Sequence, residues 1–98
     1  MVVPYRLYFF LADEFEYIQS GTCESNGMKS IHDEAMCSNA AAYFEKSSTN
    51  VIIKENNHGD DRPTGCSWHR FGNLELWKSS SGVCEVNGYD GCFCLKSS

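Results

Sequence analysis

The chain has 98 residues, which is room for one domain and too little for a two-domain enzyme with a cleft between lobes. The 42% apolar and 21% charged residues exclude a disordered chain. Eight Lys and Arg against thirteen Asp and Glu give a formal net charge of −5, which opposes binding to the phosphate backbone of a nucleic acid.

Residues 1–14 are predicted to form an apolar arm ahead of a single cysteine-rich domain at 15–98. The apolar run Leu7 to Ala12 is too short to span a membrane, which takes about 20 residues, and it does not fit a signal peptide, because Phe10 stands where a small residue would precede the cut. Such an arm needs a cover, either the domain's own sheet or a neighbouring subunit. Its candidate partner-binding residues are Tyr5, Tyr8, Phe9, Phe10 and Leu11.

The first predicted element is a half-buried strand over Glu14–Gln19, where polar residues alternate with aromatic or aliphatic ones. Ser30 is then predicted to cap a helix that runs to about Lys46. Within this helix, one apolar stripe at i, i+3, i+4 and i+7 contains a cysteine, whose sulfur should face the core. The stripe consists of Cys37, Ala40, Ala41 and Phe44.

The second half of the chain is predicted to be mostly strands. Val51–Ile53 is a short β-branched run, and Glu55–Pro63 is a polar surface loop. Two further strands, Cys66–Arg70 and Asn73–Lys78, form a hairpin. Alternation along the second strand places Leu74 and Leu76 on one face and Glu75 and Trp77 on the other.

The last predicted strand, Gly91–Lys96, carries Cys92 and Cys94 on the same face. The order of elements is strand, helix and then strands. We therefore expect an α+β fold, a small disulfide-rich domain with an antiparallel sheet of about four to five strands packed on one helix.

The cysteines themselves indicate a compartment. An even number in a short chain predicts a disulfide framework, which persists in oxidising surroundings, so we expect a secreted or organelle-lumen location. Spacing alone does not choose the pairing. The six are Cys23, Cys37, Cys66, Cys84, Cys92 and Cys94.

A structural zinc site is the rival use of these thiols, with His32, His58 or His69 as further ligands. Only one tight cysteine pair is present, whereas such sites usually offer two closely spaced ligand pairs. We therefore expect disulfides, no metal and no cofactor.

Three aromatic residues of the predicted hairpin, Trp68, Phe71 and Trp77, are candidates for partner binding. They either pack in the core, as a small domain needs, or form an exposed patch for a protein or a sugar.

Catalysis is not indicated. A cysteine nucleophile would lose its thiolate on oxidation, and no sequence motif of a hydrolase or a phosphate-binding loop occurs. Neighbouring acids such as Asp60 and Asp61 are usually solvated. We expect no enzymatic activity.

A set of short motifs across residues 15 to 94 resembles an uncharacterised small cysteine-rich module of predicted proteins from single-celled algae and related protists. Where that family has an aromatic strand ending in Asn, this chain has Leu74–Lys78. The layout of helix and hairpin is also similar to that of apple-type adhesion domains, without their full cysteine pattern. The motifs are Ser20-Gly21-Thr22-Cys23, Cys37 with Ala40-Ala41-Ala42, Arg62-Pro63-Thr64-Gly65-Cys66 and Cys92-Phe93-Cys94.

The algal resemblance implies a bridge between Cys37 and Cys66, with Cys23 and Cys84 sharing the last two cysteines in an open order. Cys92 and Cys94 should not bridge each other, because side chains at i and i+2 of a strand point in parallel.

Together these features favour a non-catalytic binding or scaffold protein, an accessory subunit held on a larger extracytoplasmic or lumenal assembly. Given the algal resemblance, that assembly could be a photosynthetic membrane complex, on its thylakoid-lumen side. The protein partner would contact the arm and the aromatic hairpin, with the chain peripheral to the membrane. The alternatives are a secreted carbohydrate-binding or adhesion module, with Trp68 or Trp77 as the stacking surface, and a small hydrolase or redox enzyme.

Overall fold

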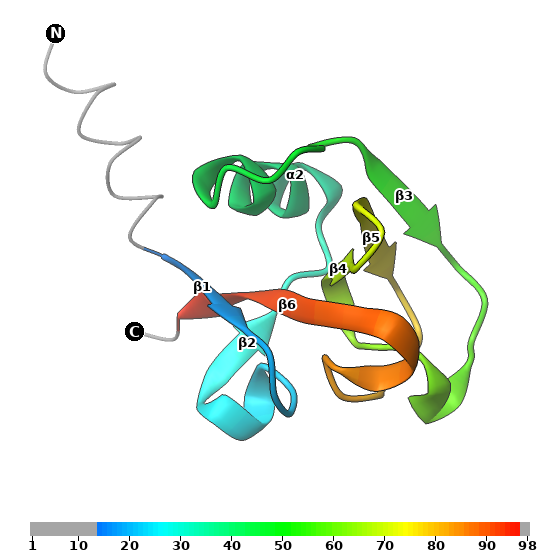
Figure 1. The fold of residues 1–98 in the computed structure, drawn as a ribbon. Coiled ribbons are helices and arrows are strands. Elements are labelled where there is room, and N and C mark those ends of the chain that lie inside the picture. The colour runs from blue at the N-terminus through cyan, green and yellow to red at the C-terminus, as the bar shows by residue number, and fades with distance from the viewer. Residues whose placement is uncertain (1–13, 97–98) are drawn as a thin grey trace, which may run out of the picture.

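The structure, a computed structural model, describes residues 14–96. This part of the chain folds into one sheet and one α-helix, connected by loops that contain short 3₁₀ turns (Figure 1). The elements are β1 (Phe15–Ile18), η1 (Glu24–Asn26), β2 (Met28–Ser30), α2 (Glu34–Tyr43), β3 (Val51–Lys54), η2 (Gly59–Asp61), β4 (Gly65–His69), β5 (Asn73–Trp77), η3 (Val86–Gly88) and β6 (Tyr89–Lys96).

The sheet has the strand order β1-β6-β4-β5-β3, with β2 also paired to β6. Every pairing is antiparallel except that of β3 with β5. The last strand therefore lies in the interior of the sheet, with β1 along one side and both β4 and β2 along the other. The predicted α+β class is confirmed, and β2 is a strand that the sequence patterns did not indicate.

The start of the helix differs from the prediction. Ser30 does not cap it, because Ser30 pairs with Cys94 in the sheet and its hydroxyl donates to Glu24 Oε1 at 2.9 Å. Asp33 is the cap instead, since its Oδ2 accepts the backbone N–H of Met36 at 2.9 Å. The serine is used as a strand residue.

The helix also ends earlier than predicted, at Tyr43 rather than near Lys46. Glu45 adopts a left-handed conformation with φ 56°. Its N–H bonds to the carbonyl of Ala42, and the N–H of Lys46 bonds to that of Ala41. These two bonds are those of a Schellman motif, which terminates the helix.

The core lies between α2 and one face of the sheet. Leu74 and Leu76 of β5 are fully buried there, against Ala40 and Ala41 of the helix and Phe93 of β6. Because side chains alternate along a strand, the intervening Glu75 and the following Trp77 point to the opposite face, as the sequence predicts.

Three disulfides join the elements. Cys37 of α2 bonds to Cys66 of β4, which is the pairing that the algal resemblance implies. The order left open is resolved by Cys23–Cys94 and Cys84–Cys92. Cys92 and Cys94 do not pair with each other, as predicted, and a set of three disulfides is typical of oxidising extracytoplasmic surroundings.

The predicted arm, residues 1–14, lies outside the described residues except for Glu14. Its five partner-binding candidates stay predictions. No helix within residues 14–96 is long and apolar enough to cross a membrane.

Candidate functional site

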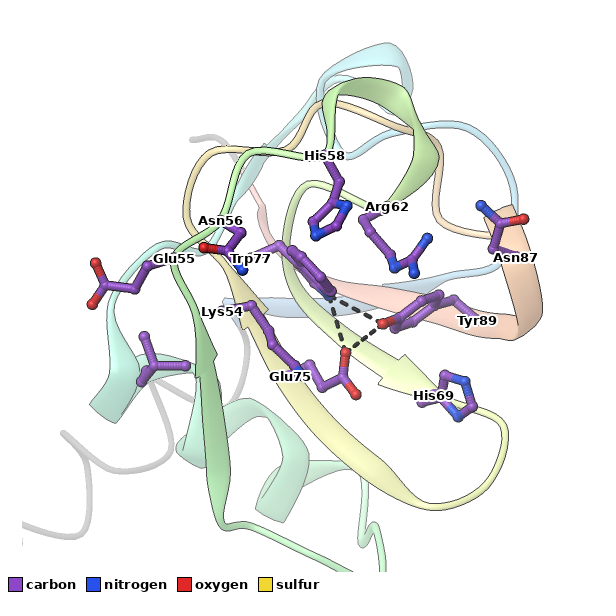
Figure 2. Close-up of a pocket in the computed structure, with 11 residues that line it drawn as sticks. Lys54, Glu55, Asn56, His58, Arg62, His69, Glu75, Trp77, Asn87 and Tyr89 are labelled. Atoms are coloured by element: carbon purple, nitrogen blue, oxygen red, sulfur yellow. Dashed lines mark hydrogen bonds between the residues drawn. The ribbon is translucent and has the colours of Figure 1, made fainter.

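A pocket of about 370 Å³ lies on the sheet face turned away from α2 (Figure 2). Its walls come from four separate parts of the chain, which are the end of β3 with the following loop, β4, β5, and the η3 turn with the start of β6. Its polar and aromatic lining consists of Lys54, Glu55, Asn56, His58, Arg62, His69, Glu75, Trp77, Asn87 and Tyr89.

Glu75 is the central group of the pocket. Its residue is only 5% exposed, and its Oε1 accepts hydrogen bonds from Trp77 Nε1 at 3.0 Å and from the hydroxyl of Tyr89. The indole N–H is shared, since it also points at the Tyr89 oxygen at 3.2 Å. Figure 2 shows the three side chains converging on this one oxygen.

The second carboxylate oxygen, Oε2, has no hydrogen bond with any side chain or backbone group of residues 14–96. An ionised carboxylate has room for about four hydrogen bonds, so this oxygen is available to a ligand. Trp77 and Tyr89 thus hold the carboxylate by one oxygen and leave the other free to accept.

Tyr89 is a permanent donor in this arrangement. Burial, the hydrogen bond to Glu75 and the charge of Glu75 together raise the pKa of its phenol well above the ordinary value of 10.0. The phenol therefore stays protonated, and it keeps donating to Glu75 across the physiological range of pH.

Two histidine rings flank the floor of the pocket edge-on. His58 stands against Trp77 with ring centroids 5.3 Å apart, and His69 stands against Tyr89 at 4.9 Å. Both are predicted zinc ligands in the rejected alternative. Within the described residues, no group of three or more His, Cys, Asp or Glu side chains could hold a metal ion.

Two cations lie over the Trp77 ring. Lys54 Nζ and Arg62 Cζ are each 5.7 Å from its centroid, within the range of a cation–π contact. Neither forms an ion pair in the described part of the chain, where the one such pair joins Lys96 and Glu16. Figure 2 shows Arg62 pointing into the space between Trp77 and Tyr89.

The loop that carries Arg62 is fixed by its neighbours. The N–H of Gly82 donates to the Arg62 carbonyl at 2.8 Å, and Asn87 Nδ2 donates to the carbonyl of Asp61 at 2.5 Å. A Cβ at position 82 would stand 2.5 Å from the carbonyl oxygens of both Arg62 and Asp60, so only glycine allows this close packing.

The three hairpin aromatics do not form one surface. Trp68 is 8% exposed and packs in the core on the helix side of the sheet. Trp77, 4% exposed, lies on the other side, under Lys54 and Arg62. Phe71 is 76% exposed at the turn between β4 and β5. Neither tryptophan therefore offers an open ring face on which a sugar could stack.

The pocket was missed as a site at the sequence level, although the alternation along β5 placed Glu75 beside Trp77. A charged residue between two leucines of a predicted strand was the available indication. Tyr89, the second partner of Glu75, could not be inferred, since it is 14 positions away and adopts its place through the pairing of β4 with β6.

No protein-family model, curated protein or solved structure matches this chain. The assignment of function consequently depends on the geometry of the pocket.

Proposed function

We propose that this chain is a binding module of an oxidising extracytoplasmic compartment and that its ligand is a saccharide unit held in the Glu75 pocket. The observation that carries the proposal is the buried Glu75 carboxylate, with one oxygen fixed by Trp77 and Tyr89 and the other free to accept.

A saccharide suits the pocket because each hydroxyl both donates and accepts. Glu75 Oε2 would accept from a hydroxyl, while Arg62, Lys54 and the amides of Asn56 and Asn87 supply donors around it. The volume of about 370 Å³ is at the small end of ligand sites, which run from about 300 to 1,000 Å³. That volume suits one sugar unit rather than a long chain.

Binding is favoured over hydrolysis by the number of carboxylates. Glycosidases usually place two carboxyl groups on opposite sides of the bond that they cleave. In the described lining of this pocket the other carboxylate is Glu55, which is exposed and points away from Glu75 (Figure 2). The arrangement therefore supports a site that holds a sugar without cleaving it.

The test is titration with a panel of neutral and acidic monosaccharides, followed by calorimetry and by the NMR signal of the Trp77 indole N–H. We expect binding by the natural chain and its loss in Glu75→Gln, which keeps the shape but replaces the accepting Oε2 by an amide. Glu16→Gln is the matched control, since Glu16 is an exposed residue of β1. Unchanged binding in Glu75→Gln, or no binding of any sugar, would refute the proposal.

The accessory-subunit interpretation makes a different prediction. If the arm holds this chain on a larger assembly, deletion of residues 1–11 abolishes assembly and leaves sugar binding intact. A photosynthetic complex as that assembly is the most specific form of this hypothesis. Loss of sugar binding on the same deletion would contradict a pocket that functions on its own.

A further inference from the structure

We infer that the bound sugar carries a single carboxylate, as a uronic acid does, and that Lys54 and Arg62 hold that acid group. This inference rests on the proposed saccharide function and names the class of sugar. It starts from the pairing of charges around Glu75.

Lys54 and Arg62 are cations without anionic partners among the described residues. Arg62 uses one N–H on the carbonyl of Asp61, at 3.0 Å from Nη1, and guanidinium has five N–H donors. The others are available to a ligand. Arginine in particular binds a carboxylate through two parallel hydrogen bonds.

The Trp77 ring prepares both cations for this role. A long side chain normally loses rotamer freedom when it engages a ligand, and this loss weakens binding. Here the indole holds both Lys54 and Arg62, with each charge 5.7 Å from the ring centroid. The side chains of Lys54 and Arg62 are therefore partly ordered before the ligand binds. Trp77 contributes to the site by holding them, although its own ring is buried.

The charges of the pocket leave room for one negative group. Lys54 and Arg62 face a single buried carboxylate, Glu75, while Glu55 is exposed and points away. Counted over Lys54, Arg62 and Glu75, the pocket has an excess of one positive charge. A ligand with one carboxylate neutralises that excess.

Glu75 also excludes other anions. Inorganic phosphate near neutral pH carries more than one negative charge, and its like charge would oppose Glu75. It also offers few hydroxyl donors for the free Oε2. A uronic acid separates the two functions within one ring, with hydroxyls for Glu75 at one end and a carboxylate for the cations at the other.

The experiment compares D-glucuronic and D-galacturonic acid with glucose and galactose by calorimetry, with the methyl ester of glucuronic acid as an uncharged analogue. We expect the acids to bind about ten- to a hundredfold more tightly than either the neutral sugars or the ester, as for the loss of a charge-assisted hydrogen bond. The preference should shrink as salt is added.

Lys54→Gln and Arg62→Gln should each lower the affinity for the acids by about tenfold. They should lower the affinity for the neutral sugars by less, because a neutral hydroxyl loses only an uncharged hydrogen bond there. The matched controls are Lys78→Gln and Arg70→Gln, which remove exposed cations outside the pocket lining. Thermal unfolding shows whether each variant is folded. If Arg62→Gln does not fold, the comparison of the acids with the ester in the natural chain still tests whether the site binds a carboxylate.

The outcomes separate the two proposals. Sugars that bind through Glu75 with no preference for the acids overturn the inference and leave the proposed function standing. Binding of inorganic phosphate in competition with glucuronic acid overturns the inference as well, because the site would then select any anion by its charge. If no sugar binds, both fail.

Discussion

Glu75 shows how a charge is kept in the interior of a small domain. Burying an ionised carboxylate is costly unless hydrogen bonds replace its water, and here two donors, Trp77 and Tyr89, meet one of its oxygens. The other oxygen accepts no hydrogen bond from residues 14–96. An apolar residue of similar size could serve a purely structural role as well, and this is why we propose a binding role for the carboxylate.

Removing the Tyr89 hydroxyl tests whether its hydrogen bond stabilises the buried Glu75 carboxylate. Tyr89→Phe leaves Glu75 with Trp77 as its one donor, and we expect a loss of about 1–3 kcal/mol in the free energy of unfolding, measured with urea. Tyr43→Phe is the control, because Tyr43 is 44% exposed. Equal, near-zero effects in the two variants would contradict the importance of the Glu75 cluster.

Two tyrosines should also ionise late. Burial and the hydrogen bond to Asp90 raise the pKa of Tyr17, as burial and Glu75 raise that of Tyr89, both well above 10.0. A pKa raised in the folded state means that the stabilisation is complete below about pH 10, the unfolded value, and is lost as pH rises beyond it.

An ultraviolet titration of phenolate absorbance checks this. The native protein should show two fewer early-ionising tyrosines than the same protein in denaturant, and Tyr89→Phe should remove one of the late ones. Titration of every tyrosine near its ordinary pKa without unfolding would contradict the buried hydrogen bonds.

Among the elements, the sequence patterns were most informative where local residues alone determine a strand or a hairpin. The alternation around Phe15–Ile18 predicts β1, and the hairpin of β4 and β5 lies where its turn residues predict it. The prediction that Ser30 caps the helix was wrong. Serine is a favourable cap residue when only local sequence is considered, whereas the pairing of Ser30 with Cys94 depends on a strand more than sixty positions away. A tertiary contact thus excludes Ser30 from α2, whereas the helix end is set locally by the Schellman motif.

The true cap can be separated from the predicted one by mutation. Asp33→Ala should cost about 1 kcal/mol of stability through the lost bond to the Met36 N–H, measured by thermal or urea unfolding. Asn39→Ala, an exposed change in the middle of the same helix, should be neutral or slightly stabilising. A neutral Asp33→Ala would show that this cap does not hold the helix.

For the molecule as a whole, the fold class and the presence of disulfides follow from composition and cysteine count, whereas the pocket does not. Its Lys54, Glu75 and Tyr89 meet through a parallel pairing of β3 with β5 and a shifted register between β4 and β6. Neither feature leaves a local trace in the sequence. A site assembled this way is visible only once the sheet order is known.

The disulfides should differ in what they contribute. The chain-entropy relation gives about 4 kcal/mol for Cys23–Cys94, with a separation of 71 residues, and about 2.5 kcal/mol for Cys84–Cys92, with a separation of 8. We expect the double alanine variant of the first pair to unfold at clearly lower urea than that of the second. Equal midpoints would contradict the entropic explanation.

The interior position of β6 affects how the protein folds during synthesis. On the ribosome, every other described strand emerges before Tyr89–Lys96, yet β1, β2 and β4 all need that segment as their neighbour. Likewise, Cys23 cannot bond to Cys94, nor Cys84 to Cys92, before β6 has been synthesised. Until Tyr89–Lys96 has been synthesised, β1, β2 and β4 therefore lack this neighbouring strand, and two of the three disulfides cannot form with their native partners.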